Sequence, residues 1–279
     1  MTGWAMCRAL RFKKSNKLPM NNLLPISRTT TALSFIFAGL VVCAGCSKSG
    51  SDEPQAGKQT AGYLSGRVTD AQGKALPGAT ILADNLLFYN SYVETSSDAN
   101  GNYRVKMPTG SYRALAQIKR TYNGKKYTLD LKPDHTEAFA GDAGAVRNFQ
   151  WQLTGEDPEQ SGLFYGGDVT LDKDIMSELY DVENIEFTFT PVGPLIDGSA
   201  GQTLKLKSGE PRTEFYGRIP DVPIGRYKIT AVHKPTGTVV MVKNKNGTYS
   251  ADGSATLDFY GETSPWACTN CMILEYKER

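Results

Sequence analysis

Histidine is scarce in this chain, which contains only His135 and His233 among 279 residues. Zinc peptidases and serine hydrolases need histidine at fixed spacing, in patterns such as His-x-x-Glu or together with a Gly-x-Ser-x-Gly elbow. His135 is followed by Thr-Glu-Ala-Phe, no such elbow occurs, and His233 lies far along the chain. The sequence therefore predicts no metal site and no catalytic residues, and we expect both histidines at surface strand or loop positions.

Acidic residues are missing from the first 45 positions, which hold six basic ones. Removing those six from the 31 basic residues of the chain leaves 25 against 29 acidic residues, a net charge of −4. The remainder also lacks a cluster of Lys and Arg interleaved with aromatic residues, the usual feature of surfaces that bind phosphate backbones. Nucleic acid is therefore not an expected partner.

A long hydrophobic run is also missing. The apolar segment TALSFIFAGLVVCA at residues 31–44 is shorter than the roughly 20 residues of a membrane-spanning helix. It is uncharged and follows Arg28 and a basic stretch, which is the arrangement of a secretory signal. We therefore expect export of the protein and removal of this segment.

The residues after that segment, Cys43-Ala44-Gly45-Cys46, resemble the lipobox of bacterial lipoproteins, where small residues precede the Cys that becomes diacylated and N-terminal. Cys43 stands where that family usually has Leu. Cleavage before Cys43 would leave the bulky Val42 at a position that must be small, so Cys46 is the predicted lipidation site. The resemblance implies a palmitate-type anchor in the cell envelope, at the outer membrane. A plain signal peptide with an incidental Cys is the alternative.

The rest of the chain has the composition of strands and turns, with 28 Gly, 14 Pro, 14 Tyr and 11 Phe. No stripe of helical period interrupts the first half, and one short helix is predicted at residues 173–181. Asn246-Gly247 is a hairpin signal. The fold class predicted is all-β, with strands at residues 64–69, 79–83, 103–107, 112–118, 126–131, 146–153, 185–190, 203–207, 226–233, 238–243, 255–260 and 272–276.

The stretch LSGRVTDAQGKALPGATILADN, followed by TSSDANGNYRVKMPTGSYRALA, resembles the carboxypeptidase regulatory-like domain, a transthyretin-like β-sandwich. The resemblance implies that fold and no chemistry of its own. We expect Gly66 and Ala79 at closely packed positions and Tyr103 and Tyr112 in the core. The residues that carry the resemblance are Gly66, Arg67, Val68, Asp70, Gly73, Pro77, Gly78, Ala79, Thr95, Asp98, Gly101, Tyr103, Pro108, Gly110 and Tyr112.

These observations predict tandem modules. The second half repeats one step of the first, because Pro108-Thr-Gly-Ser-Tyr112 is matched by Pro223-Ile-Gly-Arg-Tyr227. We expect a lipoprotein signal peptide at residues 1–45, a flexible tether at 46–61, a carboxypeptidase regulatory-like sandwich at 62–155, and a second sandwich, transthyretin-like or Ig-like, at 160–279.

Two further motifs have structural explanations. Asp98-Ala-Asn100-Gly-Asn102 has the spacing of the start of a calcium loop but lacks the later Gly and Glu, so it predicts an Asx-stabilised hairpin turn. With Cys46 lipidated, Cys268 and Cys271 are the remaining pair of thiols, and an oxidising envelope favours a disulfide between them. A redox or metal role is the alternative.

Together the residues favour a non-enzymatic, membrane-anchored envelope lipoprotein without cofactor, whose sandwiches present edges and loops to a protein or glycan partner. A carbohydrate-binding accessory protein of polysaccharide use is the main alternative, and an enzyme with convergent carboxylates is the third. Sugars would then stack on exposed aromatic rings, for which the sequence offers Trp266, Tyr260, Tyr165 and Phe164.

Overall fold

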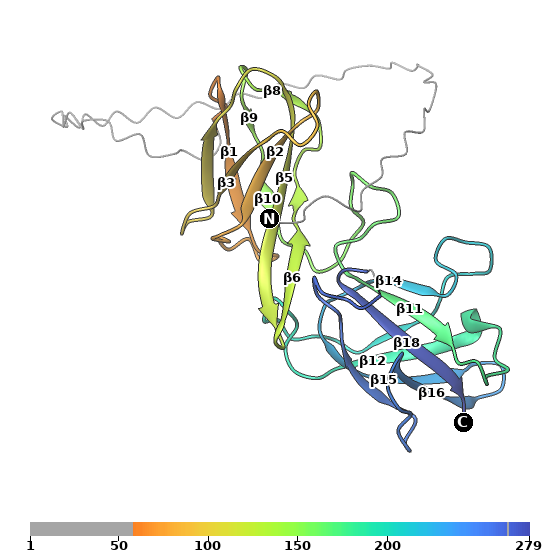
Figure 1. Ribbon diagram of the computed structural model, residues 1–279. Helices are drawn as coiled ribbons and strands as arrows, with labels where there is room; N and C mark the ends of the chain where they lie inside the picture. Colours follow the sequence, from red (N-terminus) through yellow and green to blue (C-terminus); the bar gives the residue numbers. More distant parts are fainter. Residues whose placement is uncertain (1–57, 267) are drawn as a thin grey trace, which may run out of the picture. The chain divides into compact units, whose positions relative to one another are not determined.

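Strands dominate the part of the chain that the structure describes, residues 58–266 and 268–279 of a computed structural model (Figure 1). Across these residues the only helical element is a 3-10 turn, η1 (Val182–Asn184). The predicted all-β fold class is confirmed. The predicted signal peptide and Cys46 lie outside the described residues.

Residues 63–150 form two sheets. In the first, β1 lies between β4 and the parallel strands β9 and β10, and β10 also pairs with β7. In the second, the order is β3-β2-β5-β6, and β8 pairs with the start of β5. The bounds are β1 (Tyr63–Thr69), β2 (Thr80–Asn85), β3 (Tyr92–Ser96), β4 (Asn102–Lys106), β5 (Ser111–Tyr122), β6 (Lys125–Asp130), β7 (Lys132–Pro133), β8 (Phe139–Ala140), β9 (Ala145–Val146) and β10 (Phe149–Gln150).

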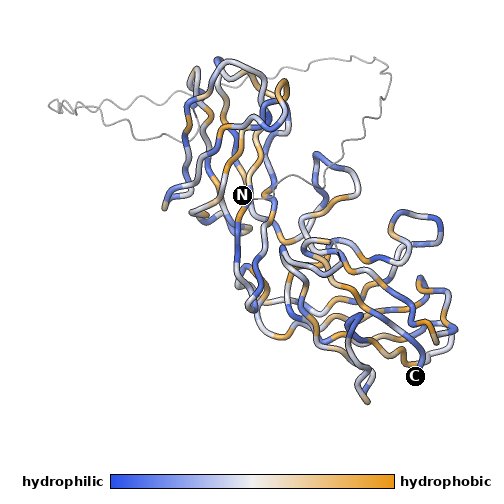
Figure 2. Tube along the Cα trace, viewed as in Figure 1, coloured by the Kyte–Doolittle hydropathy of each residue, from blue (hydrophilic) through white to orange (hydrophobic). Residues whose placement is uncertain are grey.

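The two sheets enclose a core because their strands alternate apolar and polar residues, an alternation that is visible along the chain in Figure 2. Leu64 and Val68 of β1 and Ile81 of β2 have no exposed surface. Tyr103 and Tyr112 are buried as expected, and a Cβ on Gly66 would overlap the carbonyl of Arg147. The close packing predicted at Gly66 is confirmed.

Two turns of this sandwich have the same construction. In each, an aspartate accepts backbone hydrogen bonds from residues two and four positions later, Asp70 from Gln72 and Lys74, and Asp98 from Asn100 and Asn102. The glycine three positions after each aspartate, Gly73 or Gly101, has a positive φ of 78° or 75°. The Asx turn predicted at Asp98 is therefore present.

Residues 167–278 form one eight-stranded sheet in the order β13-β12-β15-β16-β18-β11-β14, with β17 on β15. The rings of Phe187 on β12 and Tyr276 on β18 lie 6.3 Å apart although β15 and β16 separate these strands in the ladder. The sheet therefore curls until its two halves face each other across a shared core. The bounds are β11 (Gly167–Lys173), β12 (Ile185–Pro191), β13 (Leu204–Leu206), β14 (Arg218–Val222), β15 (Arg226–His233), β16 (Thr238–Asn244), β17 (Ala255–Asp258) and β18 (Cys271–Glu278).

Two local predictions are wrong. Residues 173–181 form no helix, because Asp174 Oδ1 accepts the N–H of Met176, and Glu278 accepts the Ser177 hydroxyl and the Glu178 N–H. These side-chain acceptors bond backbone N–H groups of the segment in a turn, in place of helical hydrogen bonds. Asn246-Gly247 does not join a hairpin, because β17 pairs with β15 and β16 pairs with β15 and β18.

Candidate functional site

The paired cysteines lie just before the last strand. Cys268 and Cys271 form a disulfide with Cα atoms 6.0 Å apart. The carbonyl of Cys271 accepts the N–H of Tyr260 at 2.6 Å, so the bridge is next to one of the candidate aromatic residues. Cys46, the predicted lipidation site, remains a prediction from the sequence.

Trp266 and Tyr260, two candidates for sugar stacking, are half-buried and each has a lysine over its ring. The Nζ of Lys245 lies 5.4 Å from the Trp266 ring centroid, and that of Lys125 lies 5.1 Å from the Tyr260 ring centroid. Asp172 holds Lys245 by an ion pair, which raises the pKa of that ammonium. A sugar would have to displace these cations to stack on the faces that they cover.

The other two candidates, Phe164 and Tyr165, lie in the segment before β11. Tyr165 is only 9% exposed, and its burial raises the pKa of its phenol. Phe164 is half-buried and packs edge-on against Phe215, with ring centroids 5.8 Å apart. None of the four candidate rings is therefore fully exposed, and a stacking role for them stays a prediction.

The two histidines have different surroundings. His135 is exposed beside Glu137, as expected. His233 is not at the surface: it is buried on β15, with Nδ1 2.9 Å from Thr236 Oγ1 and Nε2 2.9 Å from Asp181 Oδ2. These contacts satisfy both ring nitrogens, which explains a buried imidazole. Within the described residues no group of three or more His, Cys, Asp or Glu could hold a metal ion.

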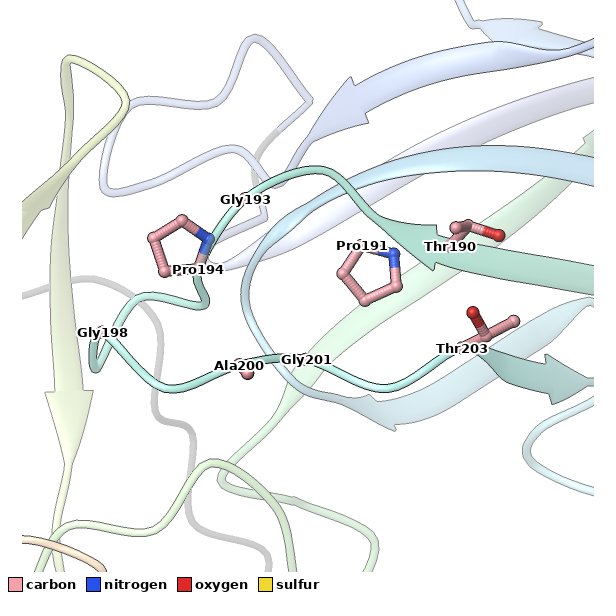
Figure 3. A pocket seen from close by; sticks show the side chains of 8 residues that line it. All are labelled: Thr190, Pro191, Gly193, Pro194, Gly198, Ala200, Gly201 and Thr203. Atoms are coloured by element: carbon pink, nitrogen blue, oxygen red, sulfur yellow. The ribbon is translucent and has the colours of Figure 1, made fainter.

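A pocket of about 420 Å³ opens at the β12–β13 connection (Figure 3). Its eight lining residues include no acid, base, histidine or cysteine. Thr190 and Thr203 supply the only polar side chains, and the Pro191 and Pro194 rings form part of its wall. The pocket therefore offers a small neutral surface without groups for acid-base or nucleophilic chemistry.

The largest exposed apolar side chains lie elsewhere, in the loop between β2 and β3. Residues 86–92 read LLFYNSY, and Leu87, Phe88 and Tyr89 are 69%, 66% and 94% exposed. This loop is not among the sites predicted from the sequence. Its signal was an uncharged apolar run of four between Asn85 and Asn90 that does not alternate as a strand does.

A second exposed group lies in the turn after β11. Ile175 is 93% exposed, and Met176 and Tyr180 are exposed as well. The Tyr216 hydroxyl donates to the backbone carbonyl of Tyr180 at 3.1 Å, which connects this turn to the segment before β14. Exposed apolar groups of this kind mark contact surfaces more often than isolated apolar residues do.

Residues 63–139 match the carboxypeptidase regulatory-like domain family. The resemblance predicted from the sequence is confirmed for that part of the chain. The match names a regulatory-like rather than a catalytic domain. The search of curated proteins returns no significant match.

Several solved structures are similar over longer stretches at low identity. The Bacillus anthracis TIE protein is 16% identical with a TM-score of 0.31, and the alignment covers 78% of this chain and 34% of that one. A putative adhesin from Bacteroides thetaiotaomicron is 11% identical with a TM-score of 0.25, and the alignment covers 64% of this chain and 79% of the adhesin. A streptococcal ancillary pilin is 13% identical with a TM-score of 0.24, and the alignment covers 78% of this chain and 62% of the pilin. The chain thus spans about a third of the first protein.

In residues 58–266 and 268–279 the structure has no helix long and apolar enough to cross a bilayer.

Proposed function

We propose that this protein is a non-enzymatic envelope lipoprotein, held at the outer membrane by a lipid on Cys46, that presents two β-sandwich modules to a binding partner. The apolar segment at residues 31–44 and the Ala44-Gly45-Cys46 sequence support the anchor. The match of residues 63–139 to a regulatory-like domain supports a role without chemistry of its own.

The observation that carries the binding role is the exposed group after β11. Ile175, Met176 and Tyr180 extend from a turn that is fixed at its centre, because the buried Ser177 donates to the Glu278 carboxylate at 2.6 Å. Apolar side chains held outward on an ordered turn favour a protein partner. A glycan partner is the second candidate and rests on Trp266 and Tyr260, whose rings have lysines over them.

The anchor is tested by cell fractionation and by mass spectrometry of the N-terminal peptide. We expect the wild-type protein in the membrane fraction with an acylated Cys46, and Cys46→Ala in the soluble fraction. Cys43→Leu is the matched control, because it changes the neighbouring cysteine and should leave the protein membrane-bound. An unmodified N-terminus elsewhere would contradict the proposed anchor.

The binding role is tested by a photoreactive residue introduced at Ile175 in growing cells. We expect one discrete cross-linked protein from this position, reduced by Tyr180→Ser, and none from a control probe at the exposed Lys205 on β13. Equal cross-linking from both positions, or none, would contradict a partner at this turn. Polysaccharide retention that Trp266→Ala abolishes would favour the glycan alternative.

A further inference from the structure

The β2–β3 loop holds its apolar side chains outward by a defined set of hydrogen bonds. Asn85 is buried, and its Oδ1 accepts the N–H groups of Leu87 at 2.9 Å and Phe88 at 3.2 Å. The N–H of Leu86 donates to Ser111, and that of Asn85 donates to Ser91. These bonds fix the backbone of the loop. Its apolar side chains are therefore exposed because an ordered backbone directs them outward.

This loop lies at the end of the sandwich where strand β1 begins. Backbone hydrogen bonds connect Gly62 to Asp142, Gly141 to Gly110, and Leu86 to Ser111, each at 2.8 to 2.9 Å. Asp142 directly follows Gly141, and Ser111 directly follows Gly110. A continuous series of bonded neighbours thus links Gly62 with the apolar loop.

The opposite end of the same sandwich is occupied. Strand β5 runs 12 residues from Ser111 to Tyr122, a length of roughly 36 Å at 3.3 Å per residue. At its far end the Tyr122 hydroxyl donates to Pro194 and the Asn123 amide donates to Asp258. The described residues beyond 167 therefore contact the end of β5 that is remote from the apolar loop.

The loop and the two turns that are bonded next to it carry little charge. Residues 86–92 contain no ionisable acid or base except the tyrosine phenols, and in the neighbouring turns at 108–110 and 141–144 only Asp142 is charged. Tyr, like Trp, is enriched at the headgroup level of a bilayer, and Phe and Leu are found on the lipid-facing side of interfacial segments. A neutral, aromatic loop suits that layer better than it suits a strongly charged protein surface.

We infer that residues 86–92 insert into the interfacial layer of the membrane to which Cys46 is anchored, an inference that rests on the proposed function. Gly62 lies sixteen positions after Cys46. A Ser- and Gly-rich chain of that length has a root-mean-square span of about 20–25 Å. The tether keeps the loop at a high effective concentration near the bilayer. A modest affinity of Leu87, Phe88 and Tyr89 for the bilayer is therefore enough to orient the sandwich with this loop toward the membrane.

The experiment uses the lipidated full-length protein in vesicles of phosphatidylethanolamine and phosphatidylglycerol that contain doxyl-labelled lipid. An environment-sensitive fluorophore is attached through Tyr89→Cys, or through Met176→Cys as the matched exposed control. With Cys46 acylated and Cys268 bonded to Cys271, the introduced thiol is the only free one after position 45. We expect quenching and a blue shift at position 89 and neither at position 176.

Leu87→Ser with Phe88→Ser should abolish the quenching at position 89 while the protein still cosediments with vesicles. Because the loop is uncharged, the quenching should persist when phosphatidylglycerol is omitted or salt is raised. Cosedimentation with no quenching at 89, or with equal quenching at 89 and 176, overturns the loop inference and leaves the anchor intact.

An unacylated Cys46 and loss of cosedimentation would overturn the proposed function and this inference together, and mass spectrometry separates that result from failure of the loop alone. Self-quenching between labels at position 89 without quenching by doxyl lipid would assign the loop to contact between two copies of the chain. That outcome also overturns the inference.

Discussion

The phenol of Tyr103 donates a 2.6 Å hydrogen bond to the backbone carbonyl of Arg147, and Gly66 lies against both partners. A Cβ on Gly66 would be 1.7 Å from the Arg147 oxygen and 3.0 Å from a ring carbon of Tyr103. This contact joins β4 to the segment between β9 and β10 across β1. The close approach of three chain segments therefore depends on the absence of a side chain at position 66.

We expect Gly66→Ala to destabilise the protein by about 3 kcal/mol or more, because the added methyl group must displace backbone rather than a flexible side chain. Chemical denaturation of the Cys46→Ala background measures the free energy of unfolding. Gly73→Ala is the control: its Cβ meets nothing within 4 Å, and only its φ of 78° opposes the change, at about 1 kcal/mol. Equal losses in the two variants would show that packing at Gly66 is unimportant.

The first sandwich could be predicted well because its motif residues have local physical roles. Asp70 and Asp98 build turns with their own side chains, and Gly66 marks a close approach whichever residues surround it. Such roles depend on short-range geometry, so the sequence pattern alone indicates them. The last strand was similarly clear, because apolar residues fill most of β18.

Features that depend on distant partners could not be predicted. Strand β3 has alternating exposed residues and few apolar ones, and it becomes a strand by pairing with β2. Residues 173–181 have a helical pattern, but the Glu278 carboxylate about 100 residues later holds them in a turn. The exposure of residues 86–92 could not be predicted either, because an apolar run usually belongs to the core.

The hydrogen bonds of the Asp98 turn predict that calcium does not change the stability of the protein. Asp98 Oδ1 already accepts the N–H groups of Asn100 and Asn102, both at 2.8 Å, and no cluster of carboxylates that could hold a metal occurs among the described residues. We expect millimolar calcium to leave the melting temperature unchanged. Asp98→Ala should lower it in the presence and absence of calcium alike, through about 1–2 kcal/mol of lost hydrogen bonding. A calcium-dependent rise that Asp98→Ala removes would contradict this account.

The Asp181–His233 pair predicts a pH dependence of stability. The hydrogen bond to His233 lowers the pKa of the Asp181 carboxyl, and the amide of Asn184 adds to this effect. A lowered folded-state pKa contributes stability at pH above the unfolded value, near 4, and that contribution is lost as pH falls through the folded value. Asp181→Asn should therefore lower the melting temperature at pH 7, and the difference from wild type should shrink toward pH 3.

Glu137→Gln is the control for that series, because the exposed pair of His135 and Glu137 should contribute little at any pH. Melting curves at closely spaced pH values from 3 to 8 distinguish the two variants. A difference between Asp181→Asn and wild type that stays constant across this range would show that the ionised carboxylate is not what stabilises the pair.

The Cys268–Cys271 disulfide should contribute stability and no chemistry. It joins residues that are three positions apart in the sequence. The entropy that so short a loop removes from the unfolded chain stabilises the folded protein by only about 2 kcal/mol. We expect the double variant Cys268→Ser, Cys271→Ser in the Cys46→Ala background to melt slightly lower, and each single variant to match the double one. Thiol titration should find no reactive thiol after position 45 in the oxidised protein. Two reactive thiols, stoichiometric zinc, or a reduction potential like that of catalytic dithiols would contradict a structural bridge, because each requires cysteines available for exchange or coordination.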